Sequence, residues 1–257
     1  MILSHKHKFI FLHCRKVAGS TITTLCNRYL GPTDIQTGAW SDTIAAGGRY
    51  NDWVVNVAQQ MDGCGRRQGK TGIAHLSPND VNRYVHRFMA KNMGMAGGAH
   101  PAAASVRNFD PVAWQDYFKF CFVRNPWTHA VSDYYWRCNG RNCDNVSFKE
   151  FLRRLADPER PDPERLVPRH RSNWDIYAIG PRVAVDFVGR YENLEADLAT
   201  VGETIGIELN LTSVPSAKAD VRPRKRSIAE HYDTEAIELV AKIYSSEISE
   251  FGYSPNF

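Results

Sequence analysis

The stretch KFIFLHCRKVAGSTI, residues 8–22, joins a short apolar run to a loop and the start of a helix. Its apolar part, residues 9–13, is of the kind that forms a strand covered on both faces, as in parallel sheets. The loop 14–21 follows, and apolar residues from Ile22 to Tyr29 then recur at helical spacing. The stretch therefore predicts a strand, a tight loop and a helix.

The same order returns twice further along the chain. FKFCFV, residues 118–123, precedes Arg124 and a helical pattern, and AVDFVG, residues 184–189, precedes a helix from Asn193. Strands that alternate with helices predict right-handed βαβ crossovers and a sheet covered by helices. We therefore expect one α/β domain over residues 1–257, with three layers and a central parallel sheet.

The segment 31–72 is rich in Gly, Asn, Asp and Gln and carries few periodic signals. It predicts an irregular insertion that extends to about residue 100 and shapes the acceptor side of the site. Within that insertion, Ser77 and Pro78 mark a helix start, and an apolar stripe beginning at Val81 indicates core packing.

Composition narrows the classes of protein. With 43% apolar and 23% charged residues the chain is globular, and a net charge of +4 favours an anionic ligand without indicating nucleic acid. The basic segment 222–226 has no interleaved aromatic residue and is weak support for a nucleic-acid patch. No long apolar run predicts a membrane span, and no signal peptide precedes the strand at 9–13, so we expect a cytoplasmic protein.

The six cysteines show no CxxC pair and no Cys/His block of zinc type. They indicate reduced thiols and no metal site. Cys138 and Cys143 are close enough in sequence to close a small loop, so a disulfide between them stays open as the minor alternative.

A site for a tetrahedral anion is predicted where the first strand meets its helix. Backbone N–H groups, the hydroxyls of Ser20 and Thr21 and the ammonium of Lys16 gather there. The loop is not of Walker A type, because Lys16 precedes Gly19 instead of following a glycine run. Its small size suits one phosphate or phosphosulfate, and an ordinary turn with a solvated lysine is the alternative.

A second anion site is predicted at the next strand end. Arg124 ends the strand 118–123, and Ser132 lies on the helix that follows. A guanidinium fork and a hydroxyl can converge there on another phosphate. Two separate anion sites indicate a nucleotide with phosphates at both ends.

These stretches resemble the sulfotransferases that use 3′-phosphoadenosine-5′-phosphosulfate (PAPS). Residues 8–22 resemble the 5′-phosphosulfate loop, and residues 118–136 resemble the 3′-phosphate strand and helix. Residues 185–198 and 231–253 resemble later segments of the sulfotransferase family 2 group, which includes carbohydrate sulfotransferases. The resemblance implies a P-loop-like fold and metal-free transfer of a sulfuryl group from PAPS to an acceptor hydroxyl, possibly of a glycan or another small metabolite.

By position, the resemblance assigns Lys16 to the 5′-phosphate and the leaving oxygen, and Arg124 and Ser132 to the 3′-phosphate. A late basic loop would cover the 3′-phosphate side. The full nucleotide-binding set implied in this way is Arg15, Lys16, Ala18, Gly19, Ser20, Thr21, Arg124, Ser132, Arg190, Arg224 and Lys225.

Transfer to a hydroxyl also needs a base, and a neutral histidine suits that role. His100 lies in AHPAAASVRNF, which resembles the family's KHATA-type segment, and is the expected base. His75, ahead of a helix, is the alternative. Arg171 stands where the family often has Gln, which would suit an anionic acceptor.

Two other functions remain open from the sequence alone. A P-loop small-molecule kinase would share the strand, loop and helix, although the loop lacks the Walker A order. A non-catalytic nucleotide- or glycan-binding relative would keep the fold without the chemistry. The oligomeric state stays open.

Overall fold

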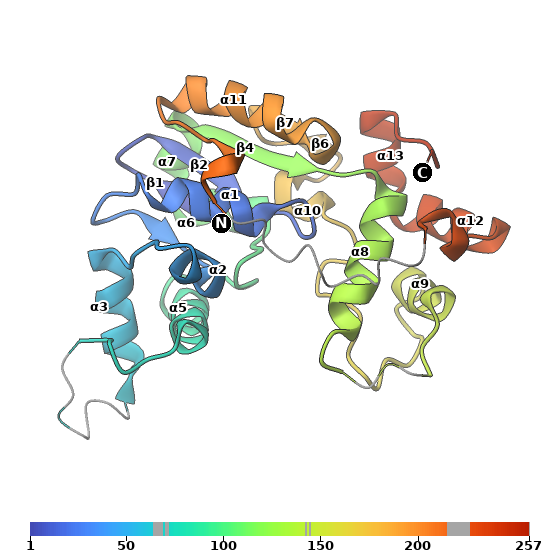
Figure 1. The fold of residues 1–257 in the computed structure, drawn as a ribbon, viewed down its shortest axis with the longest axis horizontal. Coiled ribbons are helices and arrows are strands. Elements are labelled where there is room, and N and C mark those ends of the chain that lie inside the picture. Colours follow the sequence, from blue (N-terminus) through green and yellow to red (C-terminus); the bar gives the residue numbers. More distant parts are fainter. Residues whose placement is uncertain (64–68, 70–71, 142, 144, 215–226, 257) are drawn as a thin grey trace.

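The structure is a computed structural model that describes residues 1–63, 69, 72–141, 143, 145–214 and 227–256. Its centre is a five-stranded sheet in the order β3-β1-β2-β4-β7, with helices packed around it (Figure 1). The strands are β1 (Ile2–Ser4), β2 (Phe9–Leu12), β3 (Ile35–Gln36), β4 (Phe118–Val123) and β7 (Phe187–Arg190), and a separate hairpin joins β5 (Ala178–Ile179) to β6 (Arg182–Val183).

The register of the sheet fixes where the functional loops emerge. β2 and β4 are parallel with Leu12 beside Cys121, and β4 and β7 are parallel with Val123 beside Arg190. The carboxyl ends of these three strands therefore meet at one edge, which is where open α/β sheets bind their ligands. This confirms the predicted α/β fold with a central sheet flanked by helices.

The sheet is mostly rather than wholly parallel, since β1 pairs antiparallel with both β2 and β3. β1 was not predicted, because the three residues Ile2–Ser4 are too few to give a periodic signal. β1 and β2 form a hairpin in which Ile2 lies opposite Phe11.

Helices account for most of the remaining described chain. They are α1 (Gly19–Asn27), α2 (Trp40–Ala45), α3 (Asp52–Met61), α5 (Pro78–Asn92), α6 (Ala103–Phe109), α7 (Pro111–Asp116), α8 (Pro126–Cys138), α9 (Phe148–Ala156), α10 (Trp174–Tyr177), α11 (Leu194–Ile205), α12 (Thr234–Ile243) and α13 (Ser245–Phe251). Within the described ranges, these helices are too short or too polar to cross a lipid bilayer.

The prediction of an irregular segment over 31–72 was wrong for most of its described part. The segment holds β3, α2 and α3, and with α5 it forms a lobe on one side of the sheet (Figure 1). The side chain of Asn51 caps α3 by accepting from the Val54 amide. Short helices joined by Gly- and Asn-rich segments have too few turns to repeat a periodic pattern, so no clear helical signal is visible in this part of the sequence.

Two apolar cores hold these parts together. The larger surrounds the sheet, where the ring centroids of Phe11 and Phe120 stack 5.1 Å apart on neighbouring strands. The smaller lies between α8, α9 and α12 at the other end of the molecule, around Phe151 and Val240 (Figure 1). Burying each large apolar side chain contributes about 1.5–3 kcal/mol, so each of the two cores stabilises the helices and strands around it.

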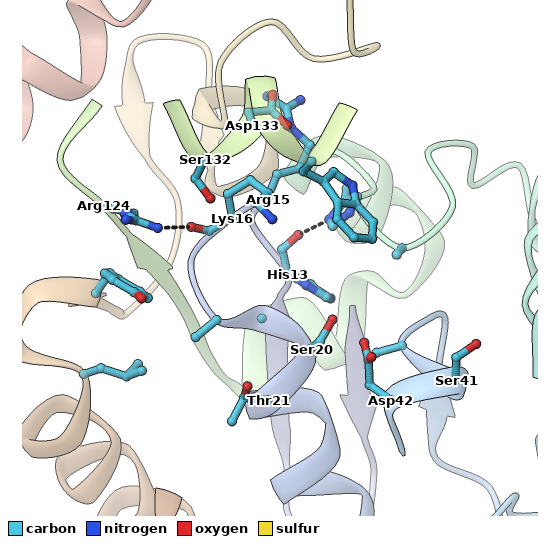
Figure 2. Close-up of a pocket in the computed structure, with 18 of the residues that line it drawn as sticks. His13, Arg15, Lys16, Ser20, Thr21, Ser41, Asp42, Arg124, Ser132 and Asp133 are labelled. Carbon is cyan, nitrogen blue, oxygen red and sulfur yellow. Dashed lines mark hydrogen bonds and ion pairs between the residues drawn. The ribbon is translucent and has the colours of Figure 1, made fainter. Parts of the chain in front are cut away.

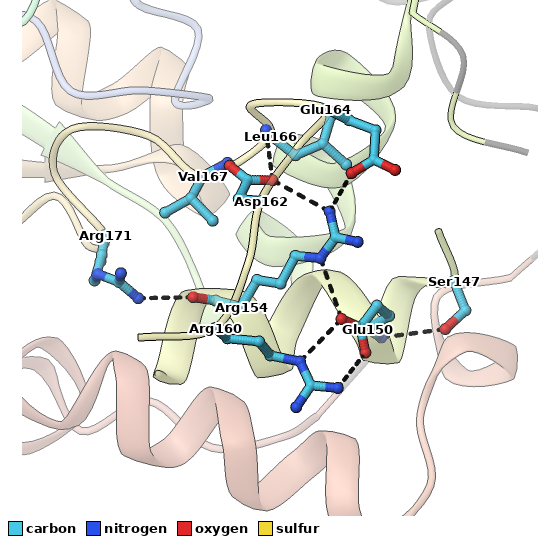
Figure 3. Close-up of polar contacts among 9 residues, drawn as sticks. All are labelled: Ser147, Glu150, Arg154, Arg160, Asp162, Glu164, Leu166, Val167 and Arg171. Atoms are coloured by element: carbon cyan, nitrogen blue, oxygen red, sulfur yellow. Dashed lines mark hydrogen bonds and ion pairs between the residues drawn. The ribbon is translucent and has the colours of Figure 1, made fainter. Parts of the chain in front are cut away.

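Ionic contacts fix the loop that follows α9 (Figure 3). The Arg154 guanidinium pairs with Glu150, Asp162 and Glu164, at 3.1, 3.2 and 2.6 Å. The Asp162 carboxylate also accepts from the amides of Leu166 and Val167. Because Arg154 is almost buried, these contacts define the path of the loop toward residues 170 and 171, whose carbonyl oxygens accept from the Arg15 guanidinium.

Candidate active site

A cavity of about 770 Å³ opens at the carboxyl ends of β2 and β4, between the α2–α5 lobe and α8. Figure 2 shows side chains from both sides directed into it. The predicted site residues that line it are Arg15, Lys16, Ala18, Gly19, Ser20, Thr21, His100, Arg124 and Ser132. Residues predicted from separate motifs thus surround one space.

The loop between β2 and α1 has an unusual backbone. Lys16 and Ala18 both have left-handed conformations, with φ of 60° and 61°. Ala18 is the residue before α1, so the turn directs the first N–H groups of that helix toward the cavity. The Lys16 ammonium lies 4.8 Å from the ring centroid of Trp136 on α8. This geometry creates a positively polarised site at the end of the loop.

Gly19 is required by a close approach. A Cβ at Gly19 would lie 2.0 Å from Cδ2 of His13, closer than any real contact. The His13 ring also stacks on Phe11, with centroids 5.7 Å apart. The glycine therefore lets the His13 ring lie flat against the loop on the cavity wall.

Arg15 lines the cavity, but its side chain is held by the protein itself. It is 7% exposed, and its guanidinium donates to the carbonyl of His170 and lies 3.5 Å from the Asp133 carboxylate. Burial alone would raise the pKa of Asp133, but Arg15 and Arg137 hold that pKa below its usual value. Arg15 thus connects the loop to α8 through its ion pair with Asp133.

Asn173 was not singled out from the sequence, yet it holds the loop in place. Its side-chain oxygen accepts from the Arg15 amide at 3.1 Å, and its nitrogen donates to the Arg15 carbonyl at 3.0 Å. His129 Nε2 lies 3.0 Å from the same carbonyl. The only nearby position noted from the sequence was Arg171, and no local pattern pointed to Asn173.

The residues of the second predicted anion site also line the cavity. Arg124 follows β4 directly, with its Nε donating to the Thr128 hydroxyl at 2.9 Å and one terminal nitrogen to the Lys16 carbonyl at 3.3 Å. The guanidinium lies 4.2 Å from the ring centroid of Tyr191. Ser132 lies two turns along α8 on the same wall (Figure 2). Thr128 and Tyr191 extend this site beyond the predicted pair.

Arg190 does not line the cavity. Its guanidinium donates to the carbonyl of Phe251 at 2.9 Å and lies 5.1 Å from the ring centroid of Tyr253. It attaches the C-terminal segment to the end of β7, and its neighbour Tyr191 reaches the cavity instead. Arg224 and Lys225 lie outside the described residues.

The orientation of the His100 ring is set by a contact with the loop. Its Nδ1 lies 2.6 Å from the carbonyl oxygen of His13. A carbonyl can only accept, so Nδ1 carries the proton and Nε2 keeps its lone pair. The ring centroids of His100 and His13 are 4.7 Å apart, edge to face. Burial lowers the pKa of His100 to about 3, so the ring is neutral at physiological pH.

His75, the alternative base, lies away from the cavity. Its Nε2 is 2.6 Å from the Asp62 carboxylate, which also accepts from the Tyr84 hydroxyl. These contacts link the end of α3 to α5, and His75 is not among the lining residues. Of the two candidates, the structure brings only His100 to Lys16 and Arg124.

Arg171 has a structural role. One of its terminal nitrogens donates to the carbonyl of Arg154 at the end of α9 (Figure 3). The same nitrogen also donates to the carbonyl of Leu155. The suggestion that Arg171 binds an anionic acceptor was wrong, because its side chain caps a helix instead of reaching the cavity. In the part of the chain that is described, no three His, Cys, Asp or Glu side chains gather as a metal site requires.

The five described cysteines are free thiols. The thiols of Cys138 and Cys143 contact each other but form no disulfide bond. Burial together with this contact raises the pKa of Cys138 to about 12. The sixth, Cys64, lies outside the described residues.

Known proteins were compared with the chain. An uncharacterized protein of Archaeoglobus fulgidus is 38% identical over 116 residues, covering 42% of this chain and 84% of that protein. Human carbohydrate sulfotransferase 14 is 36% identical over 117 residues, which cover 35% of this chain and 29% of the human protein. The zebrafish (Danio rerio) protein of that name is 32% identical over 118 residues, which cover 35% of this chain and 30% of the zebrafish protein. No solved structure matches significantly.

The aligned region therefore spans less than a third of each carbohydrate sulfotransferase. A family model covers nearly the whole chain, from residue 1 to residue 254, and its family is described as the sulfotransferase family. With the anion-binding loop, Arg124 and His100 meeting in one cavity, this match is decisive: the chain belongs to the sulfotransferase family.

Proposed function

We propose that this enzyme transfers a sulfuryl group from PAPS to a hydroxyl of a glycan or another small acceptor. The observation that carries the proposal is the shared cavity: the loop after β2, the Arg124 site and His100 all line it. Two anion sites on one cavity suit a nucleotide with phosphates at its 5′ and 3′ positions, and a base beside them suits an acceptor hydroxyl.

The donor would be held by residues of the loop and of α8. Lys16, Ser20 and the first amides of α1 would bind the 5′-phosphosulfate, and Arg124 and Ser132 the 3′-phosphate. PAPS supplies a sulfuryl group that is activated by its bond to a phosphate oxygen. Lys16 would supply fixed positive charge at the reacting group, and Arg124 would neutralise the 3′-phosphate.

In the transfer step, His100 Nε2 accepts the proton of the acceptor hydroxyl. The acceptor oxygen bonds to sulfur while the bond from sulfur to the bridging phosphate oxygen breaks, in line. Lys16 neutralises the charge that develops on that oxygen as 3′-phosphoadenosine-5′-phosphate (PAP) forms. The phosphates of the bound donor raise the pKa of His100 from about 3, so the histidine becomes a stronger base when the donor is present.

A glycan acceptor is supported by the relatives named carbohydrate sulfotransferase, although the aligned part covers only 29% of the human protein. A cytoplasmic location is supported by the free thiols among the described cysteines, which persist in reducing compartments.

The proposal is tested with the purified full chain. We expect calorimetry to detect PAP binding and no Mg²⁺-dependent binding of ATP, and labelled PAPS to sulfate at least one member of a panel of glycans and small alcohols. Preference for Mg-ATP would favour a kinase. Binding of PAP with no sulfation of any acceptor would favour a non-catalytic relative.

Variants separate the roles of the residues. We expect His100→Ala to lower kcat by about 10²- to 10⁴-fold with little change in PAP affinity, since it removes the base alone. Arg124→Ala should chiefly weaken PAP binding, and Lys16→Ala should lower both kcat and the affinity for PAP. His75→Ala is the matched control and should keep full turnover; the reverse result for the two histidines would reassign the base.

A further inference from the structure

One cationic side chain of the cavity has no part in the proposed donor site. Within the described residues, the lining holds four Lys and Arg side chains: Arg15, Lys16, Arg124 and Arg137. Lys16 and Arg124 would bind the two ends of the donor, and the Arg15 guanidinium donates to the carbonyls of residues 170 and 171. Arg137, in the last turn of α8, is the cation that remains.

The guanidinium of Arg137 is held at one end and open at the other. Its Nε lies 3.3 Å from the carboxylate of Asp133, one turn earlier on α8. Neither of its terminal nitrogens has a hydrogen-bond partner within the described part of the chain, and only Nε is closed off from solvent. Although the side chain is just 16% exposed, its end therefore presents four N–H donors to the cavity.

Positive charge is in excess at this place. The Asp133 carboxylate is shared by two guanidiniums, since Arg15 lies 3.5 Å from it on the other side. Burial lowers the pKa of Arg137, Asp133 opposes that effect, and the neighbouring Arg15 adds to it. A guanidinium nevertheless keeps its proton, so one cation is left without a balancing anion. An anionic ligand at the terminal nitrogens would supply that balance where water is scarce.

Arg137 does not share the 3′-phosphate with Arg124. α8 leads away from the sheet after β4 (Figure 1). The Arg124 guanidinium bonds to Thr128 in the first turn of α8, whereas that of Arg137 pairs with Asp133. Asp133 lies five residues beyond Thr128, which is about 7.5 Å along the axis and on a different face of the helix. The two guanidiniums therefore bind separate groups.

A chain of contacts connects Arg137 to the base. His100 is bound to the carbonyl of His13, and Arg15 follows two residues later on the same loop. The guanidinium of Arg15 pairs with Asp133, which pairs in turn with Arg137. The charges of Arg15 and Asp133 both act on His100. Arg137 thus lies on the side of the cavity where an acceptor hydroxyl would meet the base.

Resting on the proposed sulfotransferase function, we propose that Arg137 binds an anionic group of the acceptor, such as a sugar carboxylate, and so selects anionic over neutral acceptors. The two terminal nitrogens match the two oxygens of a carboxylate, which accepts a pair of parallel hydrogen bonds. Because Nε stays with Asp133, the fork is oriented before the acceptor arrives. Arg171 cannot take this role, since it is bound to the carbonyls that end α9.

The test uses acceptors that differ in charge alone. Oligosaccharides that contain hexuronate are paired with their methyl esters, which keep every hydroxyl and lose the negative charge. The full chain is assayed with labelled PAPS, and kcat/KM is compared within each pair. We expect the acid to be favoured by about 10-fold or more, which corresponds to ~1.4 kcal/mol.

Arg137→Gln removes the charge but keeps a donor for Asp133, which also retains Arg15 as its partner. We expect this variant to bring the ratio of acid to ester to about one, chiefly through a higher KM for the acid, while PAP affinity stays as in the wild type. Arg137→Lys keeps the charge without the fork and should give an intermediate ratio.

Arg107 provides the matched control, because it is an exposed arginine in the last turn of α6 outside the cavity lining. Arg107→Gln makes the same change of charge and should leave the ratio as in the wild type. Thermal midpoints and PAP affinities are measured for every variant, so that loss of folding is not mistaken for loss of selection.

A wild-type preference for the ester, or a ratio that Arg137→Gln leaves unchanged, would overturn the inference and leave the sulfotransferase function standing. A large loss of PAP affinity in Arg137→Gln would also overturn it, because Arg137 would then bind the donor. If PAP binds but neither the acids, the esters nor a wider panel of sugars and alcohols is sulfated, the proposed function itself fails.

Discussion

Asn173 pairs with the backbone of Arg15 as a neighbouring strand would, accepting from its amide at 3.1 Å and donating to its carbonyl at 3.0 Å. The next residue, Lys16, is in the left-handed conformation. A side chain from residue 173 thus holds the peptide that precedes the strained turn of the anion site. The backbone amide of Asn173 is in turn held by the Glu247 carboxylate at 3.1 Å.

We expect Asn173→Ala to loosen this turn. The Arg15 carbonyl keeps His129 as a partner, but its amide becomes a buried unpaired donor, which costs about 1–3 kcal/mol of folding free energy. PAP affinity should fall with it, because Lys16 and the α1 amides lose their fixed positions. Urea unfolding and calorimetry measure the two effects. Asn139→Ala, at an exposed position after α8, is the control and should change neither.

Gly19→Ala should be harmful for a steric reason. The new Cβ would lie 2.0 Å from the His13 ring, so the ring or the loop must move, at a cost of about 1–3 kcal/mol. Movement of His13 also disturbs the carbonyl that orients His100. Thermal unfolding and turnover should both decline. Gly63→Ala introduces a Cβ with nothing within 4 Å and should leave both unchanged; equal effects at the two glycines would exclude the clash as the cause.

Ala18→Gly is expected to stabilise the protein. Ala18 has a φ of 61°, where a Cβ costs about 1–2 kcal/mol and glycine fits freely. After the added freedom of glycine in the unfolded chain is subtracted, a gain of about 0.5–1 kcal/mol remains. Chemical denaturation measures it. Ala113→Gly, inside α7, should have the opposite sign, since helix interiors disfavour glycine.

Stability should fall as the pH drops below about 6.5. Burial lowers the pKa of His100 and of His129 to about 3, from 6.5 in the unfolded chain. Between these values the unfolded chain binds protons that the native state does not, so unfolding becomes easier with acid. Each histidine adds a slope of up to about 1.4 kcal/mol per pH unit.

Urea midpoints between pH 7 and pH 5 measure this slope. His100→Asn keeps a side-chain donor for the His13 carbonyl but does not titrate, so its stability should depend less steeply on pH than that of the wild type. A slope identical to that of the wild type would mean that His100 titrates in the native state as it does in the unfolded chain, contrary to the lowered pKa.

The sequence was most informative where a few neighbouring residues determine local structure. Buried apolar runs predicted β2 and β4 because a strand covered on both faces needs continuous apolar side chains. The Ser77 helix start was readable because a cap depends on residues only three positions apart. β1, α2 and α3 were missed because they are short or lack a sustained period, and long-range contacts stabilise them.

In the candidate site, too, the sequence predicted what depends on nearby residues and missed what depends on long-range contacts. Lys16, Arg124 and Ser132 were placed together from their positions at strand ends and on the following helix, since parallel strands bring their carboxyl ends to one edge. Arg190 also follows a strand, but the C-terminal segment captures its guanidinium. No local pattern predicts such a contact.

The stretch 8–22 by itself determined a strand, a tight loop and a helix start, and hence a small anion site, because backbone geometry and residue type act over a few positions. Only the tertiary structure decided which side chains are available to a ligand. It brings Asn173 and Asp133 to Arg15, and His13 to His100, through contacts between residues far apart in the chain. Such contacts depend on how elements pack, and packing is set by the whole core rather than by any one segment.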